Sequence, residues 1–174
     1  SMPDDEAVLA LQLRGGVQHG LGQPEAALSD LREALRRQGE QLSTRTMTLL
    51  ERIGLLQFDL GAFDKAVQYF ERAVKMARSL GHEALLWSPI HNIGRAVRDK
   101  GERRRGLGIQ EDAVRLAEDA GNLFGVATVH NSLGAGWILL GRLDKARHHL
   151  DRALQVAQRI HDRVIEAMVQ NNTG

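Results

Sequence analysis

The stretch HNSLG (residues 130–134) returns along the chain at a fixed interval, and this recurrence determines the fold that the sequence predicts. HNIG stands at residues 91–94 and QNNTG at residues 170–174, so an Asn and a Gly come back about every forty residues. A fixed period of this length is typical of repeat architectures, in which each copy is one small structural unit.

Glycine marks the same phase of every copy, and small residues follow it twelve and nineteen positions later. The recurring glycines are Gly15, Gly54, Gly94, Gly134 and Gly174; the small residues are Ala27, Ala66, Gly106 and Ala146, then Ala34, Ala73, Ala113 and Ala153; a further glycine stands between them at Gly22, Gly61, Gly101 and Gly141. Agreement of four copies at four positions indicates a true internal repeat.

Each copy contains two apolar stretches with helical spacing. In the second copy these are TLLERIGLLQFDLG (48–61) and AFDKAVQYFERAVKMA (62–77), separated by the glycine at position 61. The pattern predicts a helix, a short turn and a second helix. Glycine within a helix costs about 1 kcal/mol relative to Ala, so its recurrence predicts a close approach of backbones that leaves no room for a Cβ. A single hairpin cannot bury its apolar face, and the sequence therefore predicts an all-α solenoid of stacked hairpins.

These positions resemble the tetratricopeptide repeat, which has small residues at positions 8, 20 and 27 of a 34-residue unit. The large residue of position 24 is matched by Leu31, Phe70 and Leu150, but by Gln110 in the third copy. Two features depart from the common unit: the period is forty residues, and the usual proline at position 32 is replaced by Gly39, Arg78, Glu118 and Gln158. The resemblance covers essentially the whole chain and implies a right-handed superhelix of helix-turn-helix repeats. We expect one domain over residues 4–174, with repeats at about 4–40, 43–80, 83–120 and 123–160 and a truncated fifth at 163–174.

Two features of the repeats lead to further expectations. AMVQNNTG (167–174) aligns with ATVHNSLG (127–134), so we expect the chain to be cut from a longer protein within a first helix. Pro89 falls within the first helix of the third repeat. Either that helix kinks at Pro89, or Ser88 caps a shorter helix in which Pro89 is the first residue.

Composition and charge exclude several classes of protein. The 174 residues are 43% hydrophobic and 26% charged, which is ordinary for a globular domain. Without cysteine there is no disulfide framework, no thiol catalysis and no thiolate zinc site, and we expect a cytoplasmic protein. The net charge of +1 gives no reason to expect direct binding to nucleic acid, and no apolar run is long enough to span a membrane.

Residues that could perform catalysis or hold a cofactor or metal do not form a recognisable pattern. His148 and His149 are adjacent and point in different directions on a helix, while His91 and His130 stand at non-equivalent repeat phases. Gly106 and Gly108 lack the third glycine and the preceding strand of a nucleotide-binding fingerprint. We therefore expect no enzyme, no cofactor and no metal.

The resemblance implies a binding groove lined by the first helix of each repeat, through positions 2, 5, 6, 9, 12 and 13. Carried over to this sequence, the groove residues are Thr48, Glu51, Arg52, Leu55, Ser88, His91, Asn92, Arg95, Arg98, Thr128, Asn131, Ser132 and Ile138. Asn92 falls where the family often holds a peptide backbone, because an amide offers a donor and an acceptor together. Arginines at positions 52, 95 and 98 add donors suited to carboxylates.

The leading hypothesis is a non-enzymatic interaction scaffold that binds a peptide or partner segment in this groove, with an acidic or amphipathic ligand suiting its cations and apolar residues. Two alternatives remain open. One is a sensor or regulatory module of a larger bacterial signalling protein or transcription regulator. The other is a homotypic assembly module that associates through its open C-terminal repeat.

Overall fold

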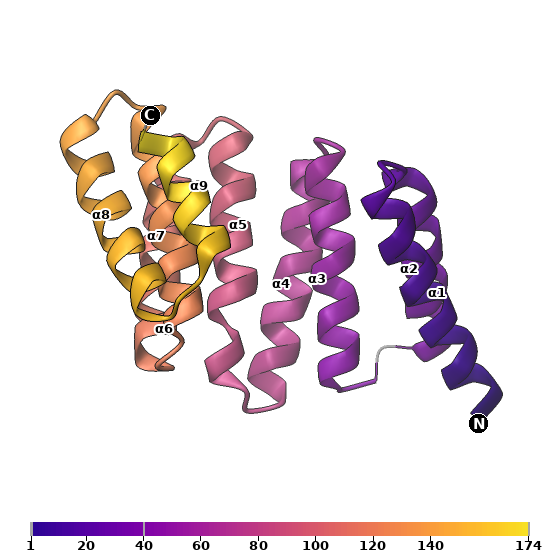
Figure 1. Cartoon of the computed structure of the whole chain (residues 1–174). Coiled ribbons are helices and arrows are strands. Elements are labelled where there is room, and N and C mark those ends of the chain that lie inside the picture. The colour runs from indigo at the N-terminus through magenta and orange to yellow at the C-terminus, as the bar shows by residue number, and fades with distance from the viewer. Residues whose placement is uncertain (1, 40, 174) are drawn as a thin grey trace. The chain divides into compact units, whose positions relative to one another are not determined.

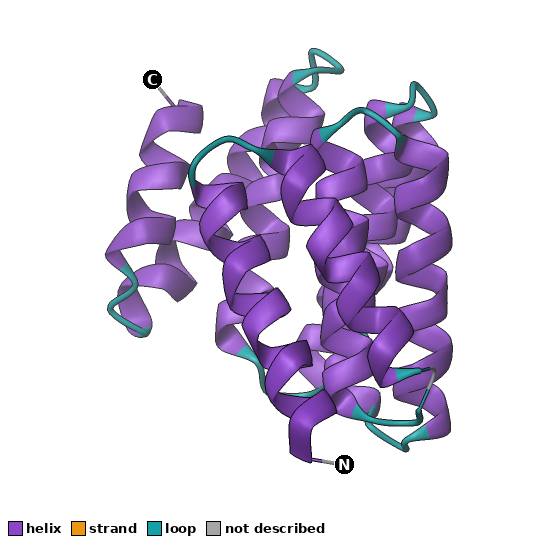
Figure 2. Ribbon diagram, turned by 90° about the vertical axis from the view of Figure 1, so that its right-hand side faces the viewer, coloured by secondary structure: helices purple, strands orange, loops and turns teal. Residues whose placement is uncertain are grey.

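The chain folds into helices joined by short turns. The computed structural model describes residues 2–39 and 41–173, and within these ranges there are nine α-helices, one short 3-10 helix and no strand (Figure 2). The helices are α1 (Met2–Gly20), α2 (Pro24–Gln38), α3 (Thr44–Asp59), α4 (Phe63–Ser79), η1 (Glu83–Leu85), α5 (Trp87–Asp99), α6 (Arg103–Asp119), α7 (Leu123–Ile138), α8 (Leu143–Arg159) and α9 (Arg163–Thr173). The predicted all-α class is confirmed. None of the described helices combines the length and the apolar character that crossing a bilayer requires.

The chain divides into two compact units, Ser1–His82 and Glu83–Gly174. In unit 1, α1 pairs with α2 and α3 pairs with α4, and α2 packs against α3. In unit 2, α5 pairs with α6 and α7 pairs with α8, while α9 packs against both α7 and α8 (Figure 1). Consecutive hairpins thus stack within each unit. The repeat boundaries expected from the sequence remain a prediction.

The recurring glycines of the first helices lie against large residues of the second helices. A Cβ built on Gly54 would lie 2.5 Å from Phe70 Cε1, and one built on Gly134 would lie 2.5 Å from Leu150 Cδ2. Such distances are well below van der Waals contact, so any larger residue would force the two helices apart. Glycine therefore recurs at this phase because the hairpin closes directly over it.

The glycines between the helices end them. Gly61 has φ 71°, a left-handed conformation that residues with a Cβ rarely adopt. Its N–H donates to the Phe58 carbonyl at 2.9 Å, and the Ala62 N–H donates to the Gln57 carbonyl at 2.8 Å. This pair of bonds is the Schellman arrangement, which satisfies the last carbonyls of α3 and turns the chain into α4.

Pro89 neither kinks a long helix nor follows a Ser88 cap, so both alternatives for this residue were wrong in detail. The 3-10 helix η1 precedes α5, which begins at Trp87 with Leu86 as its N-cap, and Pro89 is its third residue. The first backbone bond of α5 runs from the Ile90 N–H to the Leu86 carbonyl at 3.2 Å. Because the first N–H groups of any helix lack an intrahelical acceptor, proline removes no bond at this position.

Candidate interaction surface

In unit 1, the predicted groove residues lie on α3 and differ in their accessibility. Thr48 is exposed and its hydroxyl donates to the Thr44 carbonyl at 3.0 Å. Glu51, Arg52 and Leu55 are half-buried. Arg52 Nη2 donates to the backbone carbonyl of Gln12 at 3.2 Å, so its guanidinium already tethers α3 to α1. This part of the predicted groove supports the stacking of the two hairpins.

In unit 2, two of the predicted residues on α5 are buried. His91 is 5% exposed and Asn92 is 6% exposed. Both side chains were expected from the sequence to line an accessible groove. The side chain of His91 lies beside Gln110 of α6, and the amide oxygen of Asn92 accepts a bond from Arg95 of α5.

Four polar residues from three helices, which we call the polar cluster, join these packed helices: His91 and Arg98 of α5, Gln110 of α6 and Ser132 of α7. Gln110 is fully buried, and its Nε2 lies 2.7 Å from Ser132 Oγ and 3.2 Å from His91 Nδ1. An amide nitrogen has two hydrogens to donate, so Gln110 satisfies both acceptors at once. Its Oε1 lies 3.5 Å from Arg98 Nη1.

The protonation state of His91 follows from this arrangement. Burial lowers the pKa of His91 from its ordinary value of 6.5 to about 3, and the positive charges of Arg95 and Arg98 act in the same direction. The imidazole is therefore neutral at pH 7. Because Gln110 donates to Nδ1, the proton of the neutral ring is on Nε2.

Arg98 is committed to contacts inside the unit. Its side chain is only 10% exposed; Nε lies 2.7 Å from a carboxylate oxygen of Asp99, and Nη1 donates to the Ser132 carbonyl at 3.0 Å. This guanidinium binds a carboxylate on α5 and a carbonyl on α7, so few of its N–H groups remain for a ligand. Arg98 therefore fixes α5 against α7.

The predicted residues that remain accessible form a face shared by α5, α7 and α9, which we call the first-helix face. Arg95 is half-buried, and its Nη1 donates to Asn92 Oδ1 at 3.3 Å. On the neighbouring helices, Asn172 Nδ2 donates to Asn131 Oδ1 at 2.9 Å. Ser88 and Thr128 are half-buried on the same helices, and Ile138 is exposed near the end of α7. The bond from Asn172 to Asn131 connects α9 to α7, and the bond from Arg98 to the Ser132 carbonyl connects α5 to α7.

One pair of residues could not be recognised as a pair in the sequence. His130 of α7 and His149 of α8 lie with their Nδ1 atoms 2.9 Å apart. Burial is the largest cause that lowers the pKa of each ring to about 4, and the neighbouring His148 acts in the same direction on both. Both rings are neutral at pH 7, so one donates and the other accepts. Within the part of the chain that the structure describes, no three His, Asp or Glu residues come together in a way that could hold a metal ion.

Gln110 was also absent from the predicted site, although the sequence contains a signal for it. Gln110 occupies the repeat position at which the other three copies have an apolar residue, namely Leu31, Phe70 and Leu150. A buried polar residue needs hydrogen-bond partners, so a polar exception at a core phase indicates a polar neighbourhood.

Comparison with known proteins agrees with the repeat. A family model described as tetratricopeptide repeat matches residues 5–79, which confirms the resemblance that the glycine spacing indicates. No curated protein sequence matches the chain.

Solved structures share the fold at low sequence identity. Aspartyl phosphate phosphatase F from Bacillus subtilis superposes with a TM-score of 0.83 at 16% identity, over 95% of this chain and 44% of that one. A Rap protein complexed with competence and sporulation factor gives a TM-score of 0.84 at 19% identity, over 96% of this chain and 46% of that one. A Rap conjugation gene regulator in complex with a Phr peptide gives a TM-score of 0.76 at 17% identity, over 95% and 46%. The chain thus spans less than half the length of these proteins.

Proposed function

We propose that the chain is a non-enzymatic interaction module that binds an extended peptide or partner segment along the first-helix face of unit 2. The observation that carries this proposal is the bond between two first helices, in which Asn172 of α9 donates to Asn131 of α7 at 2.9 Å, beside the half-buried Arg95 of α5. The half-buried amides of Asn131 and Asn172 each have donor and acceptor positions beyond this single bond. Such groups suit the backbone of an extended chain, because they match its N–H and C=O without reading its side chains.

The charge of the face favours an acidic segment. Arg95 is half-buried on α5, and the buried His91 below it is neutral and adds no charge of its own. A guanidinium binds a carboxylate through two parallel N–H donors, which gives both affinity and orientation. Ile138 at the end of α7 offers an apolar contact for an amphipathic ligand.

A regulatory role is the second candidate, and one specific observation favours it. Two of the structures that share the fold are Rap proteins with a bound factor or peptide, and this chain spans 46% of each. In that case the peptide would act as a signal, and binding would change the activity of a larger protein. The same face would be used, so the two candidates differ only in the consequence of binding. Self-association through the C-terminal repeat is a third candidate, to be tested by molar mass in solution.

One of the similar structures is an aspartyl phosphate phosphatase, so the class of protein that competes with our proposal is an enzyme that hydrolyses acyl phosphates. Under our proposal the titratable side chains of unit 2 have structural roles: His91 accepts a hydrogen bond inside the polar cluster, and His130 is bonded to His149. Purified protein should therefore leave acetyl phosphate and phosphoaspartate peptides intact. Turnover above that of buffer would contradict the non-enzymatic class.

The experiment that tests the proposal selects peptides from a displayed random library against the purified protein and measures their affinity by fluorescence anisotropy. The test variant is Arg95→Glu with Asn131→Ala, and the matched control is Arg147→Glu with Gln158→Ala, which changes exposed residues of α8 by the same chemistry. Both variants must retain the helical circular dichroism of the parent. We expect at least a tenfold loss of affinity for the test variant and none for the control. Equal affinity for all three proteins, or the absence of any selected peptide, would contradict the proposal.

A further inference from the structure

A groove between α2 and α4 of unit 1 forms a cavity of about 650 Å³, away from the residues that the repeat phase assigns to binding. Its lining comes from one face of α2 (Glu25, Leu28, Ser29, Arg32, Leu35 and Arg36) and from Tyr69 of α4. The face runs from Glu25 to Arg36, which at 1.5 Å per residue is about 16 Å of helix, or three turns. This is the length of groove that a short helix can occupy.

The floor of the groove is apolar. Leu28 and Leu35 are seven residues apart on α2, so they lie on the same side of the helix two turns apart. They are 8% and 9% exposed, and the atoms that remain accessible face the cavity. An aliphatic side chain entering the groove would lose water-exposed surface against both leucines.

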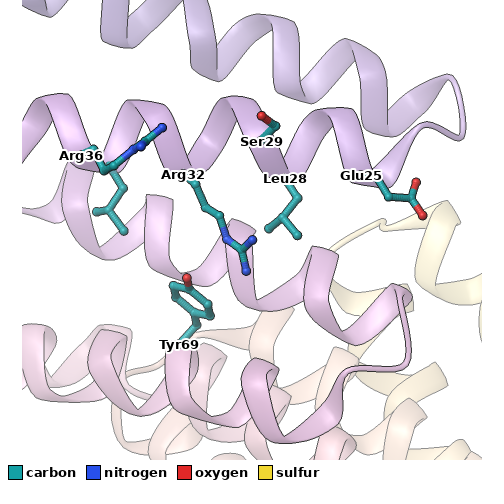
Figure 3. Close-up of a pocket in the computed structure, with 7 residues that line it drawn as sticks. Glu25, Leu28, Ser29, Arg32, Arg36 and Tyr69 are labelled. Carbon is teal, nitrogen blue, oxygen red and sulfur yellow. The ribbon is translucent and has the colours of Figure 1, made fainter.

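Arg32 stands between these leucines on α2. Arg36 and Arg37 both pair with Glu33, whereas Arg32 makes no ion pair or side-chain hydrogen bond within the described part of the chain. Figure 3 shows Arg32 of α2 and Tyr69 of α4 extending toward one another across the groove. The guanidinium of Arg72 lies over the Tyr69 ring, 5.3 Å from the ring centroid. The Tyr69 hydroxyl makes no hydrogen bond among the described residues.

A guanidinium and a phenol O–H that converge on one space are donors suited to a carboxylate. The two ends of the groove differ in charge, because Arg36 stands at one end and Glu25 at the other, with Arg32 between them (Figure 3). Carboxylates of a ligand are attracted to the arginine end and repelled from the Glu25 end. A segment with acidic side chains would therefore have a preferred direction along the groove.

We propose that this groove is a docking site for an amphipathic helix of a partner protein, with aliphatic side chains on Leu28 and Leu35 and an acidic side chain between Arg32 and Tyr69. Helices commonly dock in this way, through apolar residues three, four and seven positions apart. Charge complementarity with Arg32, which has no ion pair among the described residues, favours an acidic helix over a basic or neutral one. The site lies wholly in unit 1 and is independent of the first-helix face of unit 2.

The test uses the fact that Tyr69 is the only tyrosine of the chain. Protein labelled with 3-fluorotyrosine gives a single fluorine NMR signal, which reports the occupancy of this groove. The probe is a 16-residue end-blocked peptide with leucines on one face and glutamates beside them. A second peptide has Gln in place of every Glu, and sodium acetate at the same carboxylate concentration is the third probe.

We expect the acidic peptide to shift the Tyr69 signal saturably, the Gln peptide to bind at least tenfold more weakly, and acetate to have no effect at that concentration. Arg32→Gln should weaken the acidic peptide at least tenfold. The matched control Arg104→Gln, an exposed arginine of α6, should leave binding unchanged. The Arg95→Glu, Asn131→Ala variant should also bind normally, which separates this proposal from that for unit 2.

Four results would overturn the docking site. These are no shift with the acidic peptide, equal binding of both peptides, an equal shift with acetate, and an affinity that Arg32→Gln leaves unchanged. The second would mean that the groove binds apolar helices without regard to charge, and the third that it binds simple anions. Because Arg32 is exposed and makes no ion pair with the residues that the structure describes, its replacement should leave the thermal midpoint of the protein within roughly 2 °C of the parent.

Discussion

Gly94 of α5 lies directly over Gln110 of α6: a Cβ built on Gly94 would come within 2.5 Å of Gln110 Cγ and 2.8 Å of the Gly106 carbonyl oxygen. In the other hairpins the corresponding glycine meets Leu31, Phe70 or Leu150. The third hairpin thus keeps the close approach of its helices but places a hydrogen-bonding side chain where the others have an apolar one. This substitution organises the polar cluster of unit 2.

Replacement of Gln110 by Leu tests that role. Leucine fits the same place in two other hairpins, but it leaves His91 Nδ1 without a donor and removes the shortest bond to Ser132. We expect Gln110→Leu to lower the free energy of unfolding by about 1–3 kcal/mol, which is the cost of buried groups without a partner. The measurement is urea unfolding followed by tryptophan fluorescence, since both tryptophans, Trp87 and Trp137, lie in unit 2.

The double variant Gln110→Leu, His91→Leu supplies the control for this prediction. It removes the donor and the acceptor together, which costs less than removing one alone. We expect a stability between that of the parent and that of Gln110→Leu, with a favourable coupling between the two changes. Simple addition of the two single effects would contradict the polar cluster.

Two glycines of α6 should respond to alanine in opposite directions. A Cβ on Gly106 would lie 2.5 Å from the backbone nitrogen of Arg98, whereas a Cβ on Gly108 would have nothing within 4 Å. Gly106→Ala forces α5 and α6 apart and should cost about 1–3 kcal/mol, as overpacking of a core does. Gly108→Ala should stabilise α6 by up to about 1 kcal/mol, because alanine is the better helix former. Thermal unfolding of the two variants checks the pair, and destabilisation of equal size in both would contradict the packing described.

Acid should weaken unit 2 well before carboxylates are protonated. The pKa of His91 is lowered to about 3 and those of His130 and His149 to about 4, from ordinary values of 6.5. At pH values between these lowered pKa values and 6.5, the unfolded chain binds protons that the folded unit does not, so the free energy of unfolding rises with pH. The contribution is fully present above pH 6.5 and is lost progressively as the pH falls toward 4 and below. Urea unfolding at pH 7.0 and pH 5.0 measures this difference.

Substitution identifies the residue responsible. His91→Gln does not titrate and should reduce the difference in unfolding free energy between pH 7.0 and pH 5.0. His82→Gln changes an exposed histidine and should leave that difference as in the parent. An unchanged difference in His91→Gln would show that His91 is not buried as described.

Much of the fold could be predicted from the sequence, because it depends on residues of one hairpin. Gly54 and Phe70 are sixteen residues apart in one hairpin, and their spacing predicts that the two helices approach closely. Gly61 marks the turn between these helices. The start of α5 was mispredicted, since η1 and the Leu86 cap depend on local geometry that Pro89 permits but does not specify.

The candidate site was predicted less completely, because burial depends on neighbouring hairpins. Asn92 was expected in an open groove, but its side chain is buried in the folded unit. His91 and Gln110 are nineteen residues apart, as are His130 and His149, and no spacing rule for a single helix brings such pairs together. Arg98 was assigned to a ligand by its phase, whereas its nearest carboxylate is that of the adjacent Asp99.

The most direct test of the central claim locates a selected peptide on unit 2 by photo-crosslinking. A photoreactive phenylalanine analogue replaces Ile138, which is exposed at the end of α7, or Gln158, which is exposed on α8. The peptide proposed to lie along the first-helix face should crosslink through position 138 and not through position 158. Crosslinking through position 158 alone, or equally through both, would contradict binding at that face.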